Sequence, residues 1–449
     1  MPTNRANASP TKEFFVTTLT RDISLDDCIL DLVDNSIDGA WSVSGFHASD
    51  FEINEDLAPF TVDILIESDR FRILDNCGGI SLDNAIDYAF TFGRLQNQPD
   101  SEYSVGIYGI GMKRAIFKIG NSITIDSTYE DHRNLRGFRV PIDVHRWLTS
   151  ETTNWEFDID DSPPSDEAGV VISVQQLSEE TKNRFADPTY LPGLKRVLAR
   201  DYMIPLMRGL NINLNGERIE GEKLLLAESD QFVPMRSTYG DAEVKVEIIA
   251  GMSFKPPDSN EPDDRLSPSE TESGWYVICN GRVVLAADRS ALTGWGVGSI
   301  PRWHPQYLGF VGVAFFSAQD SSTLPMTTTK RNVDVSSSVY RRALARMEEP
   351  TRAWIDYTNK RKENDHLKAL EGVTSSQEVS YLASSPQIRL PAVVSGPARE
   401  VVANVNYSVP RARMLRLAEE FGGRTTPFRE VGLKAFDYAF EHLVDEEEE

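Results

Sequence analysis

The order of apolar and polar residues along the 449-residue chain predicts both helices and strands. From Ser24 to about Ser44 the apolar residues recur at helical spacing, and Ser24 followed by Asp27 is typical of a helix start. Two β-rich runs at 60–67 and 71–75, joined by a short polar turn, predict a hairpin. The other elements expected here are helices at 81–92 and from Met112, and strands at 122–128, 135–140, 154–159 and 169–177. This pattern indicates an α+β layer with a mostly antiparallel sheet.

The rest of the chain, from about residue 179, also mixes predicted helices and strands. A helical stretch at 179–207 precedes a strand pair at 210–219 with an Asn-Gly turn. A β-rich unit follows at about 243–316, and a charged helical stretch at 336–370 contains Pro350, which predicts a kink or a break. The last expected helices lie at about 411–421 and 428–444.

Composition narrows the classes of function. The chain has 46 basic and 69 acidic residues, and its net charge of −23 repels nucleic acid unless the basic groups are clustered. No apolar stretch is long enough to cross a bilayer and no signal peptide is apparent, so we expect a cytoplasmic protein. The odd number of cysteines and their spacing argue against a disulfide framework and a zinc site.

The predicted helix at 24–44 carries a dense acidic face. Asp31, Asp34, Asn35 and Asp38 fall within an arc of about 100°, opposite the apolar face that packs on a sheet. One interpretation is an exposed, solvated face. The other is a site for Mg²⁺, because a carboxylate and an amide oxygen one turn apart suit a hard cation and its water.

Two further segments carry candidate chemistry. Asp75 ends a predicted strand and is followed by Gly78 and Gly79, which let the backbone approach a flat ligand while the carboxylate accepts a hydrogen bond from an amine. An ordinary turn is the alternative. The segment 106–113 spaces glycines ahead of a helix, whose unpaired N–H groups suit a phosphate, and Lys113 adds charge. The Walker pattern is absent, and a glycine pattern alone is weak evidence.

The three segments together, in this order, resemble the GHKL ATPase superfamily of gyrase B subunits, MutL proteins, heat-shock chaperone ATPases, MORC proteins and sensor histidine kinases. The resemblance covers about residues 15–220 and extends more weakly over 221–345. The segment 324–334 is similar to the transducer-domain loop of the gyrase, MutL and MORC branches, and the segment 90–94 is MORC-like. The resemblance implies a Bergerat-type ATP-binding α/β sandwich, a transducer-like α+β domain and a small helical C-terminal unit.

The resemblance also implies roles for individual residues. Asn35 matches the Mg²⁺ ligand, Asp75 the acceptor for the adenine amine, and Gly79 the glycine beneath the purine. Lys330 matches the lysine that reaches the γ-phosphate, and Asp31 lies where the family has the residue that activates the attacking water. The remaining positions assigned to the nucleotide pocket are Asp38, Ile80, Gly106, Gly109, Gly111, Met112, Lys113 and Val170.

Three positions depart from the family pattern. The family usually has Glu at the position of Asp31, and an Asp carboxylate sits about an ångström short, a displacement that can reduce a rate by ~10²-fold. Slow hydrolysis, or ATP binding with almost no hydrolysis, is therefore expected. Cys77 replaces a glycine, and Val170 replaces a threonine whose hydroxyl helps to bind adenine, so affinity or purine selectivity is expected to differ.

The rest of the chain allows weaker inferences. Basic residues gather between Lys330 and Lys362, and this strip either contacts DNA phosphates or is balanced by the acidic residues among them. The C-terminal residues 401–449 predict a docking or dimerisation unit with an acidic tail. Their outline also resembles ribbon-helix-helix proteins, which leaves a DNA-binding regulator as an alternative.

The predicted organisation is an ATP-binding domain at 13–220, a transducer-like domain at 221–345, a helical extension at 346–370, a linker at 371–400 and the C-terminal unit at 401–449. We expect an ATPase that uses ATP and Mg²⁺ as a nucleotide-gated homodimer or clamp. By elimination the MORC-like or a related prokaryotic branch remains, which implies DNA transactions or defence against foreign DNA alongside a partner protein. A non-catalytic, ATP-sensing interaction module is the alternative.

Overall fold

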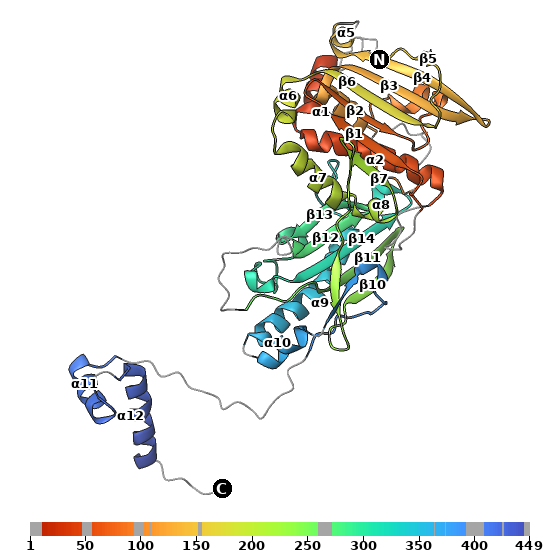
Figure 1. Ribbon diagram of the computed structural model, residues 1–449. Coiled ribbons are helices and arrows are strands. Elements are labelled where there is room, and N and C mark those ends of the chain that lie inside the picture. Colours follow the sequence, from red (N-terminus) through yellow and green to blue (C-terminus); the bar gives the residue numbers. More distant parts are fainter. Residues whose placement is uncertain are drawn as a thin grey trace, which may run out of the picture. The chain divides into compact units, whose positions relative to one another are not determined.

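Two mixed β-sheets and the helices that cover them dominate the computed structural model, so the predicted α+β fold is confirmed (Figure 1). The structure describes residues 11–46, 56–93, 103–106, 109–150, 155–258, 272–362, 364–372, 374–391, 408–423 and 426–443. The acidic tail and parts of segment 90–94 and of the predicted linker lie outside these residues. Two units, residues 1–393 and 394–449, form separate bodies, and each is described by itself.

The first sheet has eight strands in the order β5-β4-β3-β6-β2-β1-β7-β8, counted within the described residues. Neighbouring strands are antiparallel except for β1 and β7, which are parallel. The predicted hairpin is present as β1 paired with β2. The strands are β1 (Thr61–Ile66), β2 (Arg70–Asp75), β3 (Gly120–Asp131), β4 (Asn134–Asp143), β5 (Asp160–Ser162), β6 (Gly169–Leu177), β7 (Asn211–Leu214) and β8 (Glu217–Arg218).

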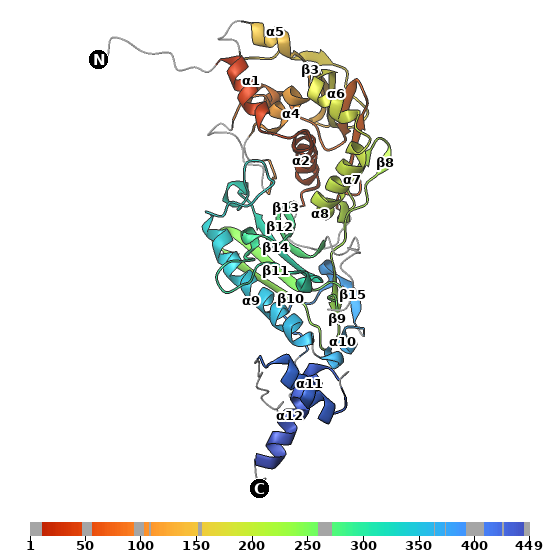
Figure 2. The ribbon, with the colours of Figure 1, turned by 90° about the vertical axis from the view of Figure 1, so that its left-hand side faces the viewer.

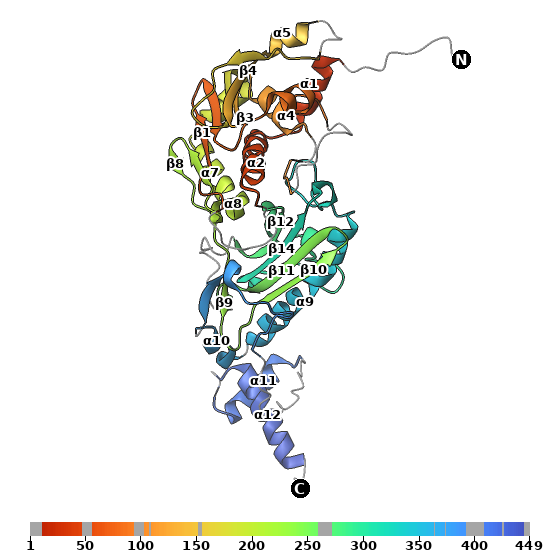
Figure 3. The same cartoon turned by 90° about the vertical axis from the view of Figure 1, so that its right-hand side faces the viewer.

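Three helices lie side by side on one face of this sheet, namely α1 (Lys12–Arg21), α2 (Leu25–Ser44) and α4 (Gly111–Ile119) (Figures 2 and 3). The Oγ atom of Ser24 accepts a hydrogen bond from the N–H of Asp27 and caps α2, as the sequence predicts. Helix α2 ends at Gly45, which has a left-handed backbone. The apolar face of α2 is buried in the core, and this fixes the direction of its acidic face.

Other helices connect the strands of the first sheet. They are the short α3 (Leu82–Asn84), which continues into the π-helical turn Ala85–Ala89, and α5 (Val144–Thr149), α6 (Glu179–Phe185), α7 (Tyr190–Asp201) and α8 (Met203–Met207). The helix predicted at 81–92 is therefore shorter and less regular than expected.

The prediction of a strand at 154–159 is wrong for the described part, 155–159, which has no ladder partner. The alternation of apolar and polar residues in this segment does not come from a strand. The ring of Phe157 lies 5.4 Å from that of Trp147, and the ring of Trp155 lies 5.6 Å from the same side chain. Every second residue thus contacts an aromatic cluster rather than the interior of a sheet. Pairing with β4 begins only at Asp160.

The second sheet has the order β10-β11-β14-β12-β13, within the same described residues. Its strands are antiparallel except for β12 and β14. The elements are β10 (Met235–Asp241), β11 (Val244–Met252), β12 (Gly274–Cys279), β13 (Arg282–Asp288), β14 (Phe310–Ala318), and the 3₁₀ turns Ala291–Thr293, Pro305–Tyr307 and Ser321–Thr323. Helix α9 (Ser338–Arg361) packs on β11 and β14 and continues through Pro350, so the break allowed by the sequence does not occur.

Part of the predicted linker at 371–400 is folded, which corrects that expectation for its described residues. After α10 (Asp365–Glu371), strand β15 (Ser375–Glu378) pairs with β9 (Leu225–Glu228). The 3₁₀ turn Val379–Tyr381 follows, and isolated bridges join Ser385 to Arg236 and Arg389 to Val233. The polar composition of this segment hides a strand that depends on a partner about 150 residues earlier in the chain.

The second unit contains α11 (Arg411–Glu420) and α12 (Phe428–Leu443) within its described residues (Figure 1). Both helices match the predicted ones. Their contact buries Ala418 and Val431.

Candidate nucleotide-binding site

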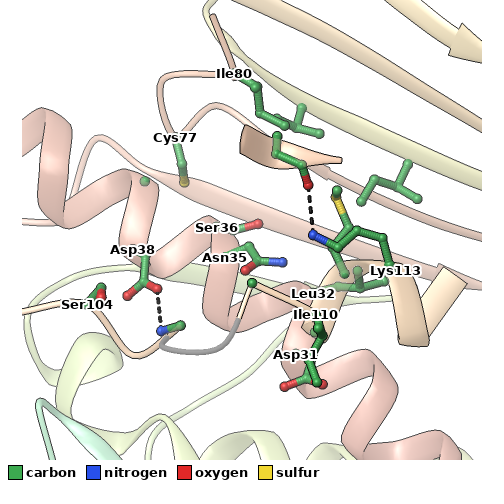
Figure 4. A pocket seen from close by; sticks show the side chains of 18 of the residues that line it. Asp31, Leu32, Asn35, Ser36, Asp38, Cys77, Ile80, Ser104, Ile110 and Lys113 are labelled. Carbon is green, nitrogen blue, oxygen red and sulfur yellow. Dashed lines mark hydrogen bonds between the residues drawn. The ribbon is translucent and has the colours of Figure 1, made fainter. Parts of the chain in front are cut away.

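A cavity of about 290 Å³ opens between α2, the end of β2, the start of α4 and the loop at 328–330. Figure 4 shows Asp31, Asn35 and Asp38 on α2, with Ile110 next to Asp31 and Lys113 on the adjoining helix α4. All thirteen residues that the sequence assigned to the nucleotide pocket or to catalysis line this one cavity: Asp31, Asn35, Asp38, Asp75, Gly79, Ile80, Gly106, Gly109, Gly111, Met112, Lys113, Val170 and Lys330. The structure brings them together, while their roles stay predictions.

Asp75 is held rigidly at the end of β2. One of its carboxylate oxygens accepts a hydrogen bond of 2.6 Å from the Ser36 hydroxyl, and the other accepts bonds from the N–H groups of Cys77 and Val170 at 3.0 and 3.2 Å. Burial raises the pKa of Asp75, although these hydrogen bonds oppose the shift. Sequence reasoning considered only the missing hydroxyl of Val170, whereas the structure shows its backbone orienting the aspartate.

Gly79 makes a close backbone approach to β3, whereas the approach to a flat ligand stays a prediction. Its φ is +72°, and a Cβ atom placed there would lie 1.9 Å from the carbonyl oxygen of Thr128. Only glycine fits both conditions. The N–H of the next residue, Ile80, donates to the Ser127 hydroxyl at 2.8 Å, which fixes the turn against β3. The turn therefore forms a flat, preformed wall of the cavity beside Asp75.

The acids of α2 differ in what they contact. Asn35 is exposed in the cavity, and its side chain has no hydrogen-bond partner among the described residues. Asp38 instead accepts bonds of 2.6 and 2.8 Å from the N–H groups of Val105 and Gly106. Burial raises the pKa of Asp38 to about 7, against the effect of these bonds. Asp38 thus anchors the glycine segment, and the Asn35 oxygen stays free for a ligand.

The start of α4 offers phosphate-binding groups. No side chain caps Ile110, so the first N–H groups of the helix lack intrahelical partners. A Cβ atom at Gly111 would lie 3.2 Å from the Asp31 carboxyl carbon, so glycine keeps α4 close to α2. The Lys113 ammonium donates to the carbonyl oxygen of Ala89 at 2.9 Å, and burial lowers its pKa to about 8.

Both carboxylate oxygens of Asp31 form ion pairs. The Arg114 guanidinium contacts one oxygen at 2.6 and 2.7 Å, and the Lys330 ammonium lies 3.3 Å from the other. The sequence predicted Asp31 as a general base but did not predict these partners. Both oxygens of the carboxylate are therefore occupied, and one of these contacts has to be exchanged before an oxygen can face a water molecule.

A buried charge cluster joins α2 to the second sheet. Lys330 contacts Asp34 at 2.7 Å, and Asp34 also contacts Arg282 at 3.2 Å and accepts a bond of 2.8 Å from the Tyr202 hydroxyl. Burial alone would raise the pKa of Asp34, but Lys330 and Arg282 outweigh it and the pKa is lowered. Arg282 continues the cluster to Asp201 at 3.0 Å.

Sequence reasoning missed Arg282, Tyr202 and Asp201. The available signal was a cation in the apolar run that follows the Asn280-Gly281 turn. The acidic face of α2 is not the solvated face of the alternative interpretation, because Asp31 and Asp34 are buried beneath these cations.

The basic strip that follows Lys330 is largely paired. Arg331 contacts Asp27 and lies 2.8 Å from Asp201, and Arg342 contacts Asp241 at 2.6 Å. The Arg346 guanidinium stacks on the Tyr239 ring at 3.7 Å. These contacts favour the balanced helix over a continuous surface for DNA phosphates.

The described carboxylates that line the cavity are not grouped as an all-protein metal site. Within the described residues no group of three or more His, Cys, Asp or Glu side chains is arranged to hold a metal ion. Mg²⁺, however, is commonly held by one or two protein oxygens together with phosphates and water. The free Asn35 oxygen fits that mode of binding.

This fold and this cavity fit the nucleotide-binding domain that the sequence resemblance implies. Residues 23–169 match the family model of histidine kinase-, DNA gyrase B- and HSP90-like ATPases, which covers α2 to the start of β6 and about a third of the chain. The chain therefore contains a domain of this ATPase type, and the match supports ATP binding. A comparison with curated proteins finds no match. Among the described helices, none combines the length and the apolar character that crossing a bilayer requires.

Proposed function

We propose that the protein binds ATP with Mg²⁺ in this cavity and hydrolyses it slowly. The observation that carries the proposal is the convergence of all thirteen predicted residues on one cavity, within a domain that matches an ATPase family. Asp75 would accept the hydrogen bond from the adenine amine above the Gly79 wall. The start of α4 and the glycine segment would face the phosphates.

Asn35 would contribute a ligand to Mg²⁺, which neutralises phosphate charge when bound. Arg114 and Lys330 orient the Asp31 carboxylate, and the shift of Lys330 towards the terminal phosphate would leave one oxygen of Asp31 free to accept a proton from water. Because Asp31 keeps its bond to Arg114 and is shorter than the usual Glu, we expect slow turnover.

The ion pairs of Asp31 also favour a second candidate, a non-catalytic ATP sensor. A steady-state phosphate-release assay on the wild type, Asp31→Glu and Asn35→Ala separates the two. Turnover by the wild type that Asn35→Ala abolishes supports the ATPase. A silent wild type with an active Asp31→Glu variant supports the sensor. Wild-type activity in Asn35→Ala contradicts the Mg²⁺ assignment.

Contacts with the second sheet support a role as a nucleotide-gated clamp. The carbonyl oxygen of Ser104, two residues before the glycine segment, accepts a bond of 3.2 Å from the Asn280 side chain, and the N–H of Tyr103 donates to the Gln319 carbonyl oxygen at 2.9 Å. The first bond holds Ser104, which lines the cavity, and Lys330 of the same transducer-like region lines the cavity itself. We propose that ATP closes two copies through this region.

The likeness of segments 90–94 and 324–334 to MORC proteins supports a role in DNA transactions or in defence against foreign DNA. Because Arg331 and Arg342 are paired with carboxylates, we assign the effector activity to a partner protein. Retention of the full chain on DNA at physiological salt, with and without ATP, tests for direct contact. Strong retention would show that this chain itself contacts DNA.

A further inference from the structure

Helix α12 has apolar side chains on two opposite sides. One side faces α11: Val431 is fully buried, the Tyr438 ring packs on Phe421, and the Lys434 ammonium donates to the Phe421 carbonyl oxygen at 3.0 Å. These residues follow the spacing of one helix face. This side therefore explains how the second unit folds, and it leaves the opposite side unused.

The opposite side carries four large apolar residues, Leu433, Phe436, Phe440 and Leu443, which are 56, 61, 50 and 83% exposed. They are spaced by three, four and three residues, the repeat of a helix that pairs with another helix. No described residue covers them. A row of such residues on one face marks an interaction surface, whereas scattered exposed apolar residues do not.

The charges at the two ends of this row select the partner and its direction. Arg429 lies one turn before Leu433 on the same face, and the sequence after Leu443 ends in Asp-Glu-Glu-Glu-Glu. A second copy aligned in parallel would place the two acidic ends together. An antiparallel copy keeps these like charges apart, and because the row reads Leu-Phe-Phe-Leu with spacings of three, four and three residues, it matches itself in that direction.

We propose that α12 pairs antiparallel with α12 of a second copy of this chain. The twofold axis of the pair passes at the level of residue 438. Leu433 of one copy therefore faces Leu443 of the other, and Phe436 faces Phe440. The pairing needs no nucleotide. It is independent of the proposed ATP site and holds two ATP-binding domains at high local concentration.

The mass of the full chain in the absence of nucleotide tests the pairing. Sedimentation equilibrium is expected to show a dimer for the wild type and an increase of at least 100-fold in its dissociation constant for Phe436→Glu and for Phe440→Glu. The control Tyr381→Glu changes an exposed aromatic residue of the first unit and should leave the dimer intact. A wild type that stays monomeric at about 100 µM, roughly ten times the dissociation constant of a weak interface, overturns the proposal and assigns the row to a different partner.

Cross-linking tests the direction. The native cysteines Cys28, Cys77 and Cys279 are buried, so introduced cysteines report alone. A mixture of Phe436→Cys and Phe440→Cys chains should form disulfide-linked pairs, and each variant alone should form few. Pairs formed by each variant alone but not enriched in the mixture indicate a parallel arrangement and overturn the proposal, as does the absence of any cross-link.

Discussion

The ammonium of Lys330 lies 2.7 Å from the Asp34 carboxylate, although Lys330 follows the second sheet and Asp34 lies on α2. The same ammonium is 3.3 Å from Asp31 and lines the cavity. The pKa of Lys330 is raised, because these carboxylates outweigh the effect of its burial. The group proposed to reach the terminal phosphate is thus held by two carboxylates, and ATP has to compete with them for it.

Removing one of these carboxylates should favour ATP over ADP. In Asp34→Asn the shape and the Tyr202 contact are kept, while Lys330 loses its nearest negative charge. We expect the ratio of ATP to ADP affinity to rise by about tenfold, which corresponds to about 1.4 kcal/mol. Calorimetric titration of both nucleotides into both proteins measures the ratio.

Asp27→Asn is the matched control for this prediction. Asp27 lies on α2, as Asp34 does, and its carboxylate pairs with Arg331. Unlike Asp31, Asp27 does not line the cavity. Its affinity ratio should equal that of the wild type. If Asp34→Asn also leaves the ratio unchanged, Asp34 does not compete with the phosphate for Lys330.

Gly79 should tolerate no side chain. The Cβ atom of Gly79→Ala would meet the Thr128 carbonyl oxygen at 1.9 Å in a left-handed backbone, so we expect a loss of about 3 kcal/mol or more in the free energy of unfolding. Gly45 has nearly the same φ, +71°, but open space around it. Gly45→Ala should therefore cost only about 1 kcal/mol. Denaturant unfolding of both variants compares them, and equal losses would contradict the close approach at Gly79.

Asp38 should make the stability of the protein depend on pH. Its folded-state pKa of about 7 exceeds the ordinary value of 3.8, so between these values the native state keeps a proton that the unfolded state releases. This contribution to stability is present at low pH and is lost as the pH rises towards 7. The wild type should lose about 2 kcal/mol relative to Asp38→Asn between pH 5 and 7.

Unfolding curves of both proteins at the two pH values check this difference. The Asn variant removes the titration while its carbonyl oxygen still accepts a hydrogen bond from the glycine segment. A constant difference between the two proteins across this range would show that Asp38 is ionised throughout.

Asn280 should transmit the state of the glycine segment to the second sheet. Its side chain donates to Ser104 at 3.2 Å and to Ala318 at 3.1 Å, and accepts from the N–H of Ala318 at 3.0 Å. Asn280→Ala removes these bonds at a cost of about 1–3 kcal/mol, although the Ser104 carbonyl oxygen still accepts a bond from the Ser321 hydroxyl. Hydrogen exchange at Val105 and Gly106 should accelerate in the variant. Unchanged exchange would show that Asn280 does not hold the segment.

Short-range sequence patterns predicted those parts of the site that depend on residues close together in the chain. The helical spacing of α2 fixed the register that points Asn35 into the cavity, and the glycines after Asp75 indicated a close backbone approach. Such features depend on neighbours within one turn or one strand end. The same holds for the two helices of the C-terminal unit.

Contacts between distant segments could not be predicted in this way. The partners of Asp34 include Arg282, which comes from β13, so no short-range pattern relates the two. The extended segment 155–159 alternates because its aromatic residues pack on Trp147, and period two alone does not distinguish this from a sheet. The ion pairs of Asp31 with Arg114 and Lys330 are of the same non-local kind.

Calorimetric titration of ATP into the wild type and Asn35→Ala, each with Mg²⁺ and with EDTA, tests the central claim most directly. We predict that the wild type binds ATP, that EDTA weakens this binding by about tenfold or more, and that Asn35→Ala removes the dependence on Mg²⁺ while ADP still binds. No heat from ATP at millimolar concentration, or a response to Mg²⁺ that is the same in both proteins, would contradict the account.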